Sequence, residues 1–239
     1  MSAYLEFLAN FGIGGAHPGG LPLTKTLLEK EKIRSETKVL DAGCGTGQTS
    51  AYLARKFQCN VTAIDNHTVM INKAAKRFSK ENVDITLVYG SIEQLPFEDQ
   101  SFDLVLAESV TVFTDIGKTL GEYARVLKPN GVLLAIEMTK EGPLSDEEIE
   151  QVKSFYSVKH VLSEEEWIGM LKNAGFQKVE SFRVHNTDDT TSLEKLSEFE
   201  LSESIDFHMF SIWMRHQDMM ERLYRRLKYR VYRATSIKA

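Results

Sequence analysis

The chain has 239 residues, of which 42% are hydrophobic and 26% are charged, and its formal net charge is −5 at pH 7. These values suit one ordinary globular α/β domain with additions. They exclude a membrane-spanning chain, because no run approaches the roughly 18 apolar residues of a span. The first residues also lack the basic start and apolar core of a secretory signal. We therefore expect a cytoplasmic protein without a membrane partner.

The first 34 residues are expected to form a lid and a helix. Residues 4–11 are apolar with helical character. Residues 12–20 contain five glycines and a proline, a density that indicates a loop. This loop is either a flexible lead-in or a lid that closes over a bound cofactor and substrate, and it carries His17. A helix is expected over 21–33.

Residues 38–47 read K-V-L-D-A-G-C-G-T-G, and the rest of the chain is organised around them. A short apolar strand reaches Asp41, and three glycines then occupy every second position, beginning with Gly43 and Gly45. Glycine lets the backbone turn sharply and approach a ligand closely. A helix over 48–57 would aim its free N–H groups at the same place.

A second strand over 61–65 ends in Asp65, about twenty residues after the glycines, where the dinucleotide fold places an acid on a ribose diol. The dinucleotide fingerprint G-x-G-x-x-G needs its third glycine three places after the second. Gln48 stands there, so that fingerprint fails. Asn66 follows on the loop, and Met70 lies in the next helical pattern.

The pattern D-x-G-x-G-x-G instead resembles motif I of class I S-adenosylmethionine-dependent methyltransferases of the small-molecule type. The alternative is a structural glycine turn in another α/β protein. The resemblance implies an α/β fold, doubly wound, with a mostly parallel seven-stranded sheet and an antiparallel final strand. This Rossmann-like methyltransferase fold would carry an N-terminal lid and helical C-terminal additions. The implied cofactor is S-adenosyl-L-methionine.

The next segments extend the resemblance. After a strand over 85–89, residues 90–97 read G-S-I-E-Q-L-P-F, similar to the G-D-A-E-x-L-P-F stretch of the family. The resemblance places adenine beside Ser91 and Ile92. The family's acid is replaced by Ser91, whose hydroxyl accepts a hydrogen bond without charge assistance, and charged bonds are roughly twice as strong.

A fourth strand over 101–108 ends in Glu108, at the edge where doubly wound sheets bind ligands. A helix over 113–127 ends in R-V-L-K-P-N-G, a family signature for a helix stop and a tight turn. The fifth strand, 132–138, carries Glu137, a weaker candidate for a base. Ser145 and Ser163 are expected to cap two further helices, and a sixth strand is expected over 177–184. The resemblance covers about residues 38–184.

The C-terminal part has an uneven charge. Residues 141–206 hold sixteen acids and six bases, whereas 207–239 hold eight bases and two acids. Apolar spacing predicts one long helix over 207–230, and 230–237 is the candidate for the last strand. The basic helix face is a solvated surface, an oligomer contact, a partner of the acidic segment in the same chain, or a nucleic-acid contact.

Cys44 and Cys59 lie near opposite ends of the helix predicted over 48–57, about 16 Å apart at 1.5 Å per residue. A disulfide needs Cα atoms within about 7 Å. We therefore expect two free thiols and no metal site.

The expected cofactor-binding set comprises Asp41, Gly43, Gly45, Asp65, Asn66, Met70, Ser91, Ile92 and Glu108. The candidate catalytic residues are Glu108 and His17, in case the acceptor needs a base. We expect a small-molecule acceptor, in a pocket lined by the aromatic residues Phe155, Tyr156, Phe199, Phe207, Phe210 and Trp213. These rings equally suit a core.

The reaction expected is an in-line methyl transfer within a single methyltransferase domain, 1–239. It divides into a lid and helix (1–34), a cofactor-binding core (35–184) and a helical addition with a possible last strand (185–239). The alternatives are an RNA methyltransferase that uses the basic C-terminal helix, and a protein that binds the nucleoside cofactor without turnover. An oligomer is possible.

Overall fold

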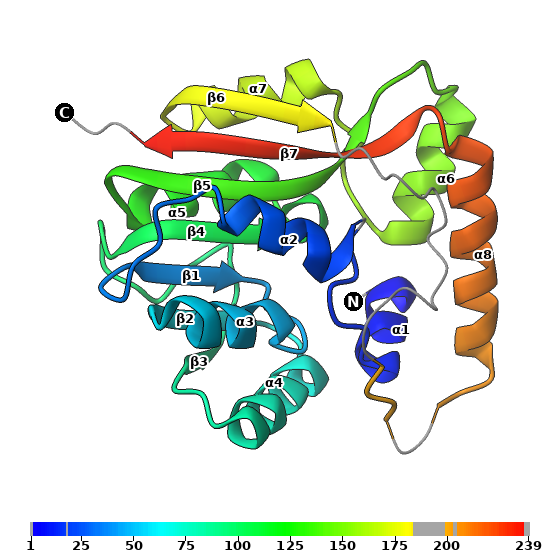
Figure 1. Ribbon diagram of the computed structural model, residues 1–239. Helices are drawn as coiled ribbons and strands as arrows, with labels where there is room; N and C mark the ends of the chain where they lie inside the picture. The colour runs from blue at the N-terminus through cyan, green and yellow to red at the C-terminus, as the bar shows by residue number, and fades with distance from the viewer. Residues whose placement is uncertain (1, 18, 184–198, 203–204, 237–239) are drawn as a thin grey trace.

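The computed structural model describes residues 2–17, 19–183, 199–202 and 205–236. It contains a seven-stranded sheet in the order β3-β2-β1-β4-β5-β7-β6 (Figure 1). The strands are β1 (Lys38–Ala42), β2 (Asn60–Asp65), β3 (Thr86–Tyr89), β4 (Phe102–Glu108), β5 (Leu127–Lys140), β6 (Phe176–Arg183) and β7 (Leu227–Ser236). The pairs from β3 to β5 are parallel, and β7 runs antiparallel to both β5 and β6. The predicted sheet, with its antiparallel final strand, is confirmed.

The helices cover both faces of this sheet. They are α1 (Ala3–Phe11), α2 (Gly20–Leu28), α3 (Gln48–Phe57), α4 (Thr68–Glu81), the 3-10 turn η1 (Thr111–Phe113), α5 (Ile116–Val126), α6 (Asp146–Tyr156), α7 (Glu164–Asn173) and α8 (His208–Leu223). Val39 of β1 packs with α2 and α3, and its neighbour Leu40 packs in the cluster that contains α5 and α7. This alternation along a strand is what a sheet buried on both faces requires.

Local sequence signals set several helix ends. Ser145 and Ser163 each accept a hydrogen bond from the N–H three residues on, and Glu148 and Glu166 bond back to them, so both predicted N-caps are complete capping boxes. Asn130 adopts a left-handed φ of 62° in the turn before the central part of β5, as expected for its place before Gly131. No helix in the described ranges is long and apolar enough to cross a membrane.

The predicted helix over 207–230 is wrong in its last seven residues, 224–230. Helix α8 ends at Leu223, and β7 begins at Leu227, three residues before the candidate last strand. The apolar spacing continued past the helix end because Leu227 and Val231 point into the core from a strand. Aromatic and β-branched residues from Tyr229 onward favour the strand, which pairs on both sides with β5 and β6.

The basic C-terminal residues contact acids of the same chain. Arg226 lies 2.7 Å from Glu148, Arg230 lies 2.7 Å from Glu141, and Arg233 lies 2.7 Å from Glu31. Arg230 also pairs with Glu164, and Arg233 with Glu180. Arg226, Arg230 and Arg233 thus each pair with an acid of segment 141–206. For these three bases, the predicted alternative of a partner in the same chain is the one observed.

Candidate active site

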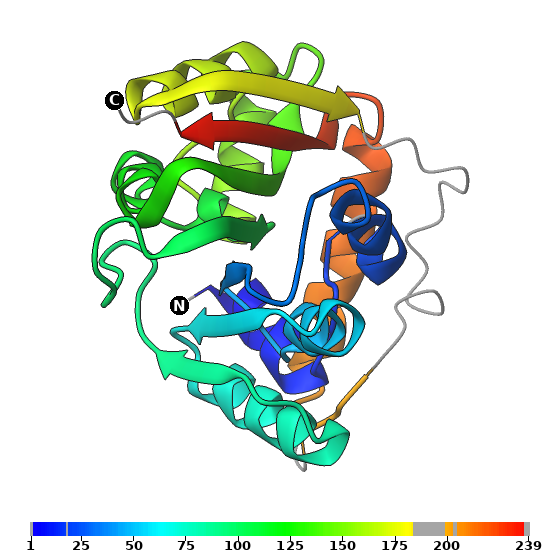
Figure 2. The same cartoon turned by 60° about the vertical axis from the view of Figure 1, so that its left-hand side comes forward.

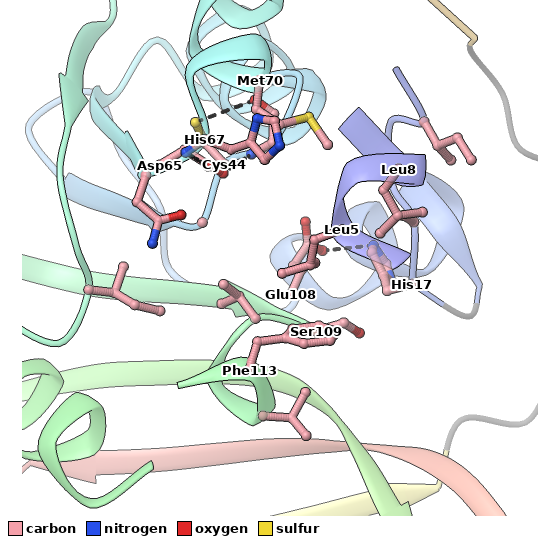
Figure 3. A pocket seen from close by; sticks show the side chains of 18 of the residues that line it. Leu5, Leu8, His17, Cys44, Asp65, His67, Met70, Glu108, Ser109 and Phe113 are labelled. Atoms are coloured by element: carbon pink, nitrogen blue, oxygen red, sulfur yellow. Dashed lines mark hydrogen bonds and ion pairs between the residues drawn. The ribbon is translucent and has the colours of Figure 1, made fainter. Parts of the chain in front are cut away.

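A cavity of about 630 Å³ opens at the carboxyl ends of β1, β2 and β4. Helix α1 lies across this edge of the sheet, next to α8 (Figures 1 and 2). Leu5, Leu8 and His17 form one wall, while Asp65 and Met70 lie on the opposite wall (Figure 3). The N-terminal segment therefore covers the place where a doubly wound sheet binds its ligands.

The glycine turn after β1 has the predicted backbone. Gly43 and Gly45 have φ angles of 74° and 54°, in the left-handed region that glycine adopts readily. A side chain on Gly43 would overlap Val110, so this position is also closed by packing. A Cβ on Gly45 would have only Met70 Sδ nearby, at 3.9 Å, because the residue faces the cavity. The turn thus exposes bare backbone to a ligand.

Asp65 lies at the end of β2 with its carboxylate held by the backbone. Its Oδ2 accepts a hydrogen bond from the N–H of Gly45 at 2.9 Å, and its Oδ1 accepts one from the N–H of His67 at 2.8 Å. Burial raises the pKa of Asp65, and these two hydrogen bonds lower it in part. Each oxygen retains a lone pair that can accept from a ligand in the cavity.

Asp41 lies behind the turn and lines the cavity. Its side chain is buried, and Ser50 Oγ donates a hydrogen bond to Oδ2 at 2.5 Å. Burial raises the pKa of Asp41 to about 7, and the nearby charge of Glu108 adds to the shift. Thr46 Oγ1, also buried at this wall, makes no hydrogen bond with the described residues.

Glu108 joins three segments at the centre of the cavity. His17 Nε2 lies 3.1 Å from Oε1, Thr49 Oγ1 donates to Oε2 at 2.7 Å, and Thr24 Oγ1 also donates to Oε1 (Figure 3 shows the bond to His17). Burial alone raises the pKa of Glu108, but the charge of His17 and the bonds from His17, Thr24 and Thr49 outweigh it and lower the pKa. The two candidate catalytic residues are thus brought together.

The sequence did not point to Thr24 or Thr49. They lie 84 and 59 residues from Glu108 in the chain, and a threonine in a helix has no motif that marks it as a partner of a distant acid. Only the close approach of α2 and α3 to the end of β4 makes the pairing.

The prediction of residues that would lie beside adenine agrees in part with the structure. Asn66, Met70 and Ile92 line the cavity. Ser91 is exposed and is not among the lining residues, and its Oγ accepts a hydrogen bond from the N–H of Glu93 at 3.1 Å. The loop presents Gly90 and Ile92 instead, so the structure does not bring the Ser91 side chain to the site.

The far end of the cavity is lined by residues that the sequence did not single out. Tyr4, Leu5 and Leu8 come from α1, and Phe113 and Tyr229 come from η1 and β7. Of the six aromatic residues expected here, only Tyr156 lines the cavity. Phe155 is buried beside Tyr4, whereas Phe207 is 87% exposed. Phe199, Phe210 and Trp213 are also absent from the lining.

Glu137, the weaker candidate base, is fully buried outside the cavity lining. Its carboxylate accepts hydrogen bonds from the N–H groups of Thr111 and Val112 at 3.0 and 3.3 Å. Burial raises its pKa to about 7. It therefore holds the start of η1 in place.

The described residues contain no cluster of His, Cys, Asp or Glu that could hold a metal ion. Cys44 and Cys59 are free and buried, as predicted.

Two comparisons with known proteins bear on the family of this chain. Residues 39–131 match the family described as "Methyltransferase domain", a range that includes the glycine turn and Asp65. The Bacillus subtilis protein YodH, named as an uncharacterized methyltransferase, is 40% identical over 221 residues, which cover 92% of this chain and 94% of YodH.

The chain belongs to the class I S-adenosylmethionine-dependent methyltransferases. The methyltransferase shares its fold with solved structures. Haemonchus contortus phosphoethanolamine N-methyltransferase 2 in complex with S-adenosyl-L-methionine gives a TM-score of 0.76 at 21% identity, covering 99% of this chain and 56% of that one. Geranyl diphosphate C-methyltransferase from Streptomyces coelicolor gives a TM-score of 0.69 at 14% identity, covering 91% and 79%. The match to the methyltransferase family and the 40% identity to YodH confirm the predicted enzyme class.

Proposed function

We propose that this methyltransferase binds S-adenosyl-L-methionine along the glycine turn and transfers its methyl group to a small-molecule acceptor beneath α1. The observation that carries the proposal is the Asp65 carboxylate, fixed by the N–H groups of Gly45 and His67 at the wall of the cavity. A carboxylate held in this way is preorganised to accept two hydrogen bonds from a ribose diol.

The residues present suit this cofactor. Gly45 leaves bare backbone at the cavity wall, where a side chain would occupy ligand space. Thr46 Oγ1 is a buried hydroxyl without a partner among the described residues, and a buried polar group of this kind costs free energy unless a ligand satisfies it. We assign the amino-acid end to the turn at Gly43 and Gly45, and the adenine to the side of Met70 and Ile92.

The charge of the cavity supports the same assignment. Asp41, Asp65 and Glu108 all line it, and no lysine or arginine does so within the described ranges. A ligand with positive charge, such as a sulfonium and an ammonium, is favoured where buried carboxylates gather.

The cofactor supplies a methyl group that is already activated on its sulfur. The protein's part is then to hold the acceptor atom about 3–3.5 Å from that methyl group, opposite the sulfur, so that one bond forms as the other breaks. Excluding water from the covered cavity serves the same end.

We assign Glu108 and His17 to holding the N-terminal segment over the site. Three donors already occupy the Glu108 oxygens, and its lowered pKa makes it a weak proton acceptor. General-base catalysis favours a group whose pKa lies near the working pH. The contact between Glu108 and His17 therefore holds the N-terminal segment over the site. A proton released by the acceptor is taken up by a group other than Glu108.

Asp65→Ala tests the assignment through the affinity for S-adenosylhomocysteine. Charge-assisted hydrogen bonds contribute about 1.5–3 kcal/mol, so the dissociation constant should rise about ten- to a hundredfold. Isothermal titration calorimetry measures the change. Asp84→Ala, at an exposed acid after α4, is the matched control and should leave the affinity unchanged. Equal affinity in the Asp65 variant and its parent would refute the role of Asp65.

A further inference from the structure

We propose that the acceptor end of the cavity takes an uncharged, largely apolar molecule with a flat ring, and that Tyr4 determines this fit. The proposal rests on the proposed function, because it concerns the space beside the assigned cofactor site. That space is bounded by α1, η1, α6 and β7. Its substrate class follows from the charge, shape and hydrogen-bonding groups of its walls.

The charge of the walls argues against a phosphate-bearing acceptor. The cavity lining includes no lysine or arginine within the part of the chain that the structure describes. The nearby Lys73 of α4 donates to the carbonyl oxygens of Asn10 and Glu200 and does not line the cavity. The lining histidines face carboxylates, His17 toward Glu108 and His67 toward Glu6. A buried phosphate without cationic partners would pay a large desolvation penalty.

The shape of the walls suits a ring. Tyr4 lies edge-on to Tyr156 with ring centroids 4.8 Å apart, and it stacks with Phe113 at 6.4 Å and an interplanar angle of 25°. Leu5 and Leu8 continue the same wall on α1 (Figure 3). Aromatic and aliphatic walls bind flat apolar ligands through burial of surface and offset ring contacts.

The hydrogen-bonding groups at this end are uncharged. Burial raises the pKa of Tyr4 and of Tyr156, and it raises that of Tyr229 to about 12, so these hydroxyls stay protonated. Tyr156 Oη lies 2.7 Å from Nδ1 of His216, and burial lowers the pKa of His216 to about 4. Neutral tyrosines can bind the hydroxyl or carbonyl oxygen of an uncharged acceptor.

This inference separates the protein from two of its structural neighbours. Their names include phosphoethanolamine and geranyl diphosphate, and both of these molecules carry phosphate. At 21% and 14% identity the neighbours share the fold with this chain, and the acceptor end of the cavity can differ while the fold is kept.

Three probes with one ring system test the charge preference. The 239-residue chain is first saturated with S-adenosylhomocysteine and then titrated calorimetrically with 1-naphthol, 1-naphthyl phosphate or 1-naphthylmethylamine. We expect 1-naphthol to bind at least about tenfold more tightly than 1-naphthyl phosphate or the protonated 1-naphthylmethylamine. Neither charged group finds a partner of opposite charge at the acceptor end of the cavity. Tighter or equal binding of either charged probe, or no binding of 1-naphthol to the loaded protein, overturns the proposal.

The titration with S-adenosylhomocysteine distinguishes failure of the proposed function from failure of the acceptor inference. If S-adenosylhomocysteine itself fails to bind, the proposed function falls and the acceptor inference falls with it. If it binds and only the probe ranking differs from expectation, the proposed function stands and the acceptor class is wrong.

Variants of Tyr4 test its role. Tyr4→Ala should weaken 1-naphthol binding about tenfold or more and leave S-adenosylhomocysteine affinity within about twofold. Tyr224→Ala, at the end of α8 and outside the cavity lining, is the matched control. Tyr4→Phe keeps the ring and removes only the hydroxyl, so it should cost about two- to tenfold. It decides the matter if Tyr4→Ala does not fold, and unchanged 1-naphthol affinity in Tyr4→Phe would then reject the role of Tyr4.

Discussion

Glu137 combines complete burial with a carboxylate, which makes the stability of the protein depend on pH. Its folded-state pKa is raised from about 4.5 to about 7, chiefly by burial. Between these values the folded state binds more protons than the unfolded state, so the free energy of unfolding decreases as pH rises. Above about pH 7, Glu137 is ionised in both states and the free energy of unfolding no longer changes with pH through this group.

Glu137→Gln should remove this dependence. Each pKa unit corresponds to 1.36 kcal/mol, so the stability of the parent relative to the variant should fall by about 2–3 kcal/mol between pH 4.5 and pH 7. Urea unfolding at several pH values measures the difference, in which the similar contribution of Asp41 cancels. Parallel curves for the two proteins would show that Glu137 is not held with a raised pKa.

The proximity of the candidate site residues could be predicted where the information is local. Gly43, Gly45 and Asp65 belong to a strand, a turn and the next strand tip, and their order in the chain dictates their proximity. Ser91 failed because the loop's backbone conformation decides whether a side chain faces the cavity. Thr24 was not predicted, because its contact with Glu108 depends on the packing of two distant elements.

The N-terminal segment packs Tyr4, Phe7, Phe11 and Ile13 into the main core and is also tied to it by polar contacts. Besides the contacts of Glu108 with His17 and Thr24, the Lys73 ammonium donates to the carbonyl of Asn10 at 3.2 Å. These polar contacts join elements that are far apart in sequence, and they add to the apolar packing that keeps the segment over the cavity.

Thr24→Val should loosen this segment. The substitution removes a donor to a buried carboxylate, a bond worth about 1.5–3 kcal/mol, so amide hydrogen exchange in residues 13–28 should accelerate about tenfold or more. Hydrogen exchange read by mass spectrometry compares the variant with Thr26→Val. The Thr26 hydroxyl bonds only to the Pro22 carbonyl of its own helix in the described structure. Equal exchange in the two variants would contradict the role of Thr24.

The apolar periodicity of the sequence predicted helices and strands correctly until α8 and β7 followed each other with no helix-ending residue between them. Residues 224–226 lack the glycine or proline that commonly separates a helix from a strand. The apolar spacing of α8 therefore ran on into β7, and only pairing with β5 and β6 defines where the strand begins.

The whole molecule joins its acidic and basic parts. The strand β7 carries Arg230 and Arg233 into the sheet, where Arg230 pairs with Glu141 and Glu164. Arg233 pairs with Glu180 of β6 and with Glu31, which precedes β1. The charge asymmetry of the sequence thus reflects contacts within the fold. Sequence alone left this open, because ion pairs over long separations depend on which strands are neighbours.

The central claim is that the cavity at the carboxyl ends of β1 and β2 is a nucleoside site for a sulfonium cofactor. The most direct measurement is calorimetric titration of the 239-residue chain with S-adenosylhomocysteine and, separately, with NAD. We predict saturable binding of S-adenosylhomocysteine at one site per chain and no binding of NAD. Binding of NAD in competition with S-adenosylhomocysteine, or no binding of S-adenosylhomocysteine, would contradict the claim.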